Sequence, residues 1–144
     1  GYDRNVLVAE GPGPGVFRST ETGSLEPTIY TIAPNADGTG TATIPDTIFD
    51  YHAVITSANA NHWVTLPTPV VGRKVTLYIS GATGYEIRSN APATVGISGG
   101  TGANAESAIA ATALVVKLEC VSATNWVGLS QVAASTETAV EAAA

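Results

Sequence analysis

Residues 96–100 contain the serine best placed for nucleophilic chemistry, because Gly-Ile-Ser-Gly-Gly fits the G-x-S-x-G pattern of a nucleophile elbow. In that hydrolase order the serine lies between a strand and a helix, and an acid and then a histidine follow it along the chain. Here both histidines, His52 and His62, precede Ser98, and a glycine-rich loop follows it. The pattern therefore predicts a strand end that runs into a turn, and we expect no catalytic residue and no enzyme.

Ligand types for a metal ion or a phosphate are present, but their spacing does not predict a site. His52 and His62 have no third ligand at a metal-site spacing. Residues 35–38, Asn-Ala-Asp-Gly, resemble the start of a calcium loop, but the closing glutamate is missing. The glycines of 99–102 lack the lysine of a phosphate-binding loop. Cys120, in phase with apolar neighbours, indicates an inert core thiol, so we expect no metal and no cofactor.

Two further groups of residues leave their chemistry open. Glu86, Glu106 and Glu119 could supply the acid–base pair of a glycosidase, but the sequence does not bring any two of them together. Trp63 and Trp126 could line a sugar-binding face with three tyrosines, Tyr51, Tyr78 and Tyr85. The alternative, which we favour, is that both tryptophans are core or interface anchors, because aromatic side chains dominate both settings.

The composition excludes several kinds of partner. The chain has 144 residues, a formal charge of −6, 44% hydrophobic residues and 12% charged residues, about half the usual charged share. Six Lys and Arg residues spread along the chain cannot form a phosphate-neutralising stripe, so we expect no nucleic acid partner. The most apolar stretch, 108–116, is shorter than the ~20 residues of a membrane span, so we expect no membrane partner.

Short runs of alternating residues, each bounded by turn residues, predict an all-β fold. Thr, Val and Ile dominate these runs, as a pleated and half-buried surface favours. The best-supported run puts Leu114, Val116, Leu118 and Cys120 on one side. The pattern predicts an antiparallel β-sandwich of jelly-roll-like type, while residues 105–111 could form a helical turn or a plain loop. The expected strands cover 6–8, 28–32, 39–44, 51–56, 62–66, 74–80, 85–88, 94–97, 114–121, 125–129 and 138–141.

Residues 9–27 depart from this pattern, because they show little alternation and contain the run Gly-Pro-Gly-Pro-Gly. Proline fixes φ and has no amide hydrogen to donate, so this run cannot lie inside a sheet. We therefore expect an extended Gly/Pro-rich N-terminal arm over 1–27 and a β-sandwich domain over 28–144. The candidate interface residues are Pro12, Pro14 and Phe17 in the arm and Trp63 and Trp126 in the domain.

Residues 62–130 carry a recognisable order of turns and strands. The segment 62–67 is HWVTLP, 70–79 is VVGRKVTLYI, and 118–126 is LECVSATNW, with two short strands and a Gly-rich stretch between the second and the third. This order resembles the β-sandwich modules of tailed-bacteriophage virion proteins, in which a VTLP-type strand pair is followed further along the chain by a TNW segment. The resemblance covers about half the chain.

That family spans distal tail-fibre domains and small capsid decoration (cement) proteins, which are commonly trimeric. One domain without heptads, preceded by an extended arm, fits the decoration type better. The resemblance implies a non-enzymatic homotrimer that binds the major capsid protein on the outer surface of the phage head shell and stabilises the shell. Such a protein is made in the host bacterial cytoplasm and resides on the virion. The alternative is a tail-fibre or spike module that binds a host-surface glycan or receptor through Tyr78 or Tyr85.

Overall fold

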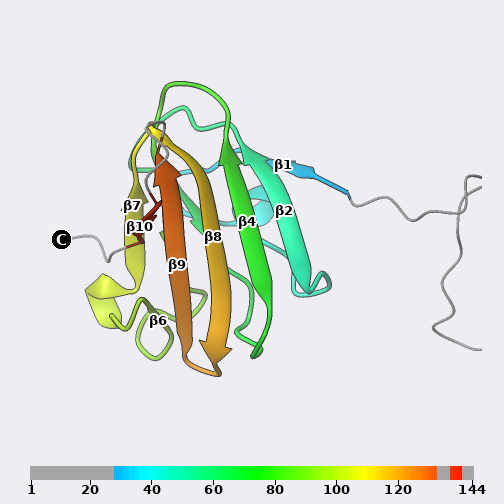
Figure 1. The fold of residues 1–144 in the computed structure, drawn as a ribbon, viewed down its shortest axis with the longest axis vertical. Coiled ribbons are helices and arrows are strands. Elements are labelled where there is room, and N and C mark those ends of the chain that lie inside the picture. Colours follow the sequence, from blue (N-terminus) through cyan, green and yellow to red (C-terminus); the bar gives the residue numbers. More distant parts are fainter. Residues whose placement is uncertain (1–27, 133–136, 141–144) are drawn as a thin grey trace, which may run out of the picture.

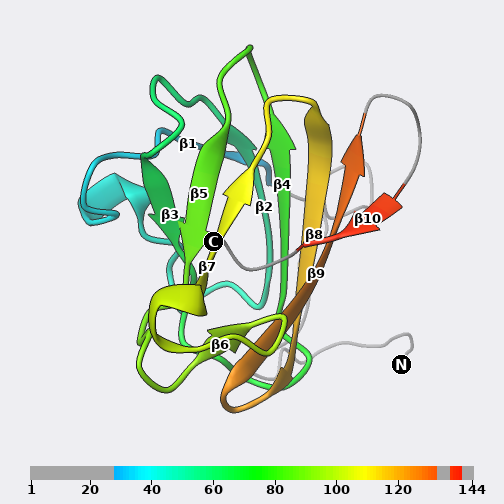
Figure 2. The ribbon, with the colours of Figure 1, turned by 90° about the vertical axis from the view of Figure 1, so that its left-hand side faces the viewer.

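The computed structural model describes residues 28–132 and 137–140, and within these the chain forms two sheets (Figures 1 and 2). The larger sheet contains, side by side, β1 (Tyr30–Ile32), β2 (Asp50–Ile55), β4 (Lys74–Ile79), β8 (Ala113–Ser122), β9 (Asn125–Val132) and β10 (Glu137–Ala139), with β6 (Gly96–Ile97) paired to β9. The smaller sheet contains β3 (Trp63–Thr65), β5 (Tyr85–Arg88) and β7 (Glu106–Ile109). The predicted all-β class is confirmed for these residues.

The chain crosses repeatedly from one sheet to the other, and this explains a feature that the sequence analysis had wrong. From β2 it passes to β3 in the smaller sheet, back to β4 in the larger sheet, and then to β5 in the smaller sheet. Because two successive crossings reverse the direction twice, neighbours within one sheet run parallel: β2 with β4, and β3 with β5. The sheets are therefore mixed rather than antiparallel throughout, and β1–β2 and β6–β9 are parallel as well.

The core lies between the two layers, which Figure 2 shows side by side. The larger sheet contributes Leu77, Leu118 and Trp126, and the smaller sheet contributes Tyr85 and Ile87, all fully or almost fully buried. These residues alternate along their strands with outward-pointing neighbours, as a strand with one buried face requires.

Strand β8 confirms most of the expected alternation, since Val116, Leu118 and Cys120 are buried. Leu114 is the exception and is exposed, because the pairing of β8 with β9 shifts register between Ala113 and Val115. A bulge of this kind takes one residue out of the alternating phase, so the prediction that Leu114 points inward was wrong.

Two other expectations were wrong, and one lies outside the described residues. The expected strand at 39–44 is instead a 3₁₀ turn, η1 (Gly40–Ala42), because Gly38 and Gly40 take positive φ values of 64° and 60° that end an extended run. Within 105–111, where a helical turn or a loop was expected, the chain forms β7 after a second 3₁₀ turn, η2 (Gly102–Asn104). The arm over 1–27 and its strand at 6–8 are not among the described residues.

Candidate functional site

Ser98 lies in a turn in which its amide and its hydroxyl are both hydrogen-bonded to other parts of the chain. It takes a positive φ of 53°, its amide donates to the carbonyl oxygen of Trp126 at 2.6 Å, and its hydroxyl donates to the carbonyl oxygen of Val140. A glycine turn and the short η2 follow it rather than a long helix. The serine therefore joins β6 to β9 and to the segment after β10, in agreement with the turn that the sequence predicts.

The two histidines are held in different sheets. His52 is in β2 of the larger sheet, and His62 directly precedes β3 of the smaller sheet, with its Nδ1 3.3 Å from the carbonyl oxygen of Pro34. Among the residues that the structure describes, no group of three His, Cys, Asp or Glu side chains could hold a metal ion. Cys120 is buried, and this burial raises the pKa of its thiol, which donates to the carbonyl oxygen of Ser122 at 2.9 Å.

The structure brings two of the three candidate glutamates together. Glu86 and Glu106 lie on the side of the smaller sheet that points away from the core. Both pair with Arg88, Glu86 at 3.1 Å from Nη2 and Glu106 at 2.7 Å from Nε. The guanidinium also lies over the ring of Trp63, 3.7 Å from its centroid. Glu119 is on the larger sheet. We call Trp63, Glu86, Arg88 and Glu106 the arginine cluster, which connects all three strands of the smaller sheet.

Trp63 and Trp126 were both predicted as interface candidates, but only Trp63 has exposed surface. Trp126 has no exposed surface and is therefore a core residue, which corrects its assignment as an interface candidate. Trp63 is half-buried between Arg88 and the turn at Gly38, where an added Cβ would lie 2.0 Å from the indole Nε1. Pro12, Pro14 and Phe17 lie outside the described residues.

The tyrosines do not form a common sugar-binding face. Tyr85 is buried, and burial raises the pKa of its phenol, so it cannot act as the exposed aromatic that the alternative function needs. Tyr51 is buried and stacks on Tyr30 with ring centroids 5.0 Å apart. Tyr78 is half-buried on the outer side of the larger sheet.

The outer side of the larger sheet is where the structure leaves apolar surface uncovered by the described residues. Register places its outward-pointing residues in rows across β2, β4, β8 and β9. One row is Asp50, Lys74, Glu119 and Val127, and the next is His52, Thr76, Lys117 and Leu129. The surface thus changes from polar over β2 and β4 to apolar over β9. We call this surface the outer face.

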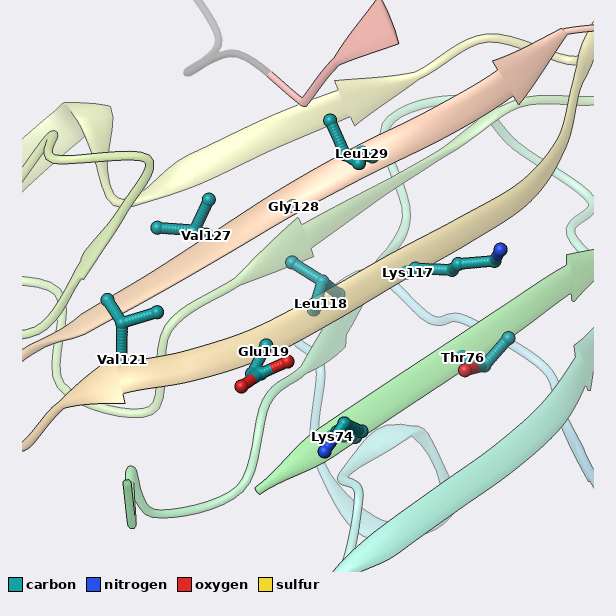
Figure 3. Close-up of a pocket in the computed structure, with 9 residues that line it drawn as sticks. All are labelled: Lys74, Thr76, Lys117, Leu118, Glu119, Val121, Val127, Gly128 and Leu129. Atoms are coloured by element: carbon teal, nitrogen blue, oxygen red, sulfur yellow. The ribbon is translucent and has the colours of Figure 1, made fainter. Parts of the chain in front are cut away.

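A hollow of about 470 Å³ crosses the outer face, and Figure 3 shows the residues of β4, β8 and β9 that line it. Its apolar part is formed by Val121, Val127 and Leu129, of which 44–49% remains exposed. Its charged part is formed by Lys74, Lys117 and Glu119. We call this hollow the outer groove, and an exposed apolar patch beside charged side chains is a composition found on protein-binding surfaces.

The apolar surface continues beyond the groove at one end of the sheet. The amide of Gly72 donates to the carbonyl oxygen of Cys120 at 2.8 Å, which places the turn with Val70 and Val71 beside Val121. Both turn valines are exposed, at 44% and 64%.

A chain of polar contacts borders the groove on its other side. Asp50 Oδ1 lies 3.2 Å from His52 Nε2, and His52 Nδ1 lies 3.2 Å from the hydroxyl oxygen of Tyr78. All three residues point outward from β2 and β4.

Sequence reasoning found only part of the outer face. The alternation predicted for 114–121 puts Val121 on the side opposite Cys120, but no face was predicted for Val127 and Leu129. The sequence shows only that β9 is apolar at alternate positions of both phases. The burial of Trp126 and Gly128 in the structure places Val127 and Leu129 on the side toward solvent.

No protein-family model, curated protein or solved structure matches this chain. Among the described residues, none of the helical pieces has the length and apolar character to cross a membrane.

Proposed function

We propose that this protein is a non-enzymatic decoration protein of a tailed-phage head, which binds the major capsid protein on the outer surface of the shell as a homotrimer. The observation that carries the proposal is the outer face, where apolar side chains stay exposed over two neighbouring strands. A monomer gains nothing from exposing such a surface, whereas a partner protein covers it. The proposal includes a jelly-roll-like sandwich as the architecture of the family that the sequence resembles.

The low charge of the chain supports a role in repeated protein contacts. Charged residues are depleted at the centres of protein interfaces, and only 12% of this chain is charged. On a shell that repeats the same site, a trimer with an arm on each copy binds many sites at once. Each bound contact raises the local concentration of the next one, so weak individual contacts give firm attachment.

The test uses capsids of the phage that encodes this chain, assembled without it. The purified protein is added, and the bound amount is measured by co-sedimentation and by electron microscopy of the shells. We expect Val127→Thr combined with Leu129→Thr to weaken binding at least tenfold, because it removes the apolar part of the groove.

The matched control is Ala108→Thr, at an exposed position on the smaller sheet, which should bind as the unaltered chain does. Equal binding by the groove variant and the control would contradict a role for the outer face. Failure of the unaltered chain to bind these capsids would contradict the decoration function. Sedimentation velocity checks the trimer, and a monomer at micromolar concentration would contradict it.

A second candidate function is a tail-fibre or spike module that binds a glycan. The observation that favours it is the polar chain of Asp50, His52 and the Tyr78 hydroxyl beside the apolar groove, since sugars need hydrogen-bonding groups next to an apolar surface. A glycan array probed with the unaltered chain and with Tyr78→Ala tests it. Binding that is lost in the variant supports this candidate, and no binding by the unaltered chain contradicts it.

A further inference from the structure

The outer groove has no occupant among the described residues, and the chain itself contains a segment that fits it. We propose that the outer groove binds residues 4–10 of this chain, Arg-Asn-Val-Leu-Val-Ala-Glu, in an extended form. We call these residues the arm segment. The proposal concerns the free chain, in which the arm segment covers the groove until the capsid protein takes its place on the shell. It rests on the proposed function only in treating the outer face as a surface for protein contacts.

The spacing of apolar residues is the same on both sides of the proposed contact. In an extended segment, Val6 and Val8 point to one side and lie roughly 7 Å apart, since a strand rises about 3.3–3.4 Å per residue. Val127 and Leu129 in β9 have the same two-residue spacing and point outward into the groove. Val6 can therefore pack over Val127 while Val8 packs over Leu129, and Leu7 points away.

Charge sets the direction of the segment. Arg4 and Glu10 share the phase of the two valines, so they flank the apolar pair on its groove side, one at each end. In the groove, Glu119 is next to Val127 and Lys117 is next to Leu129. With the segment running in the direction of β9, the cation comes near Glu119 and the anion near Lys117.

The length of the connecting chain allows this contact. The described residues begin at Thr28, directly before β1, and four strand-to-strand steps of about 4.8 Å separate β1 from β9, roughly 19 Å in all. Residues 11–27 can span up to about 56 Å when extended. The prolines at 12 and 14 cannot join a sheet, so the part of the arm with strand character ends at Glu10.

Disulfide trapping in the full chain tests the contact. Two variants carry cysteine pairs in the proposed register: Val6→Cys with Val127→Cys, and Val8→Cys with Leu129→Cys. We expect both to cross-link under mild oxidation at least tenfold faster than Leu7→Cys with Leu129→Cys, whose first cysteine has the opposite phase. Buried Cys120 is common to all variants and does not distinguish them. Equal rates for in-phase and out-of-phase pairs would overturn the proposal.

Charge reversal provides a second readout in the Val8→Cys, Leu129→Cys background. Lys117→Glu should slow cross-linking several-fold, and adding Glu10→Lys should restore it. No effect of either change would overturn the proposed direction of the segment.

A single Leu129→Cys chain identifies a different occupant. If it forms disulfide-linked dimers as fast as the double variant cross-links, a second copy lies directly against the groove, and the proposal is wrong. These outcomes are independent of the capsid experiment. A chain that binds capsids but fails the trapping test retains the proposed function and loses only the arm segment as occupant.

Discussion

The outward-pointing side chains of the two sheets differ in how many of their contacts are made within the protein itself. On the smaller sheet, Arg88 pairs with Glu86 and Glu106 and lies over Trp63, while the turn at Gly38 packs against the same indole. On the larger sheet, Val127 and Leu129 are exposed. One surface is thus occupied by internal contacts, and the other has apolar area that the described residues leave uncovered.

This difference separates stability from binding. The arginine cluster connects β3, β5 and β7 through charge-assisted contacts between half-buried groups, so its loss should reduce the free energy of unfolding. The exposed residues of the outer face bury little apolar area within the described chain, so changing them should cost little stability. Four predictions test this separation, in order of the expected change in unfolding free energy.

Arg88→Ala should have the largest effect, a loss of about 2 kcal/mol, because it leaves two half-buried carboxylates without their cation and removes the contact with the Trp63 ring. Urea denaturation at neutral pH measures it. The matched control is Lys117→Ala, an exposed cation of the outer face, which should change the value by no more than about 0.5 kcal/mol. Similar losses in both variants would mean that the two surfaces do not differ in this way.

Gly38→Ala should cost slightly less, about 1.5–2 kcal/mol, because the new Cβ would meet the Trp63 indole at 2.0 Å in addition to the strain at a φ of 64°. Gly40 isolates the backbone part of this cost. Its φ is 60° and nothing lies within 4 Å of an added Cβ, so Gly40→Ala should cost only about 1 kcal/mol. Thermal unfolding of both variants gives the comparison, and equal losses would show that the turn does not press on Trp63.

Asp46 offers a smaller effect that depends on pH. Hydrogen bonds from the backbone and the side chain of Thr68, both 2.8 Å, lower the pKa of this exposed carboxyl below 3.8. Its contribution to stability is therefore complete above pH 3.8 and is lost as the pH falls through the lower, folded-state pKa.

Asp46→Asn should therefore cost no more than about 1 kcal/mol at pH 7, and the difference from the unaltered chain should shrink as the pH falls below 3.8. Denaturant titrations at a series of pH values measure this. A difference that stays constant down to pH 2 would contradict the assigned cause.

The smallest effect is expected for Val127→Thr with Leu129→Thr. Threonine suits a strand, and both side chains are 44% exposed, so the free energy of unfolding should stay within about 0.5 kcal/mol for each change. Urea denaturation checks this value on the same protein that is used for capsid binding. A large loss would place the outer face among the elements that hold the fold together.

The sequence predicted most strands well and their pairing poorly, for a physical reason. Alternation and turn residues are local, so runs such as 74–80 and 85–88 appear in the structure as β4 and β5 with nearly the same ends. Parallel pairing depends on which sheet each strand joins, and no local pattern contains that information. Residues 106–109 were missed because Ser107 is buried in a strand, where a polar residue breaks the expected apolar pattern.

The surface proposed for binding was harder to predict than the fold. Trp126 suggested an interface and is in the core, because a large aromatic side chain suits both settings. Val127 and Leu129 belong to a strand that is apolar on both sides, and such a strand suggests complete burial. Only the position of β9 in the sheet shows that one of its sides faces outward.

The crossing of the chain between the two sheets has a consequence for folding. Since β2, β3, β4 and β5 alternate between the layers, the parallel pairs β2–β4 and β3–β5 can each form only after the chain has crossed to the other layer and back. Such long-range pairings slow folding, because the entropy of closing each loop is lost before the contacts form. The same alternation joins the layers into one cooperative unit, so amides of β4 and β5 should exchange with solvent through a common global opening rather than sheet by sheet.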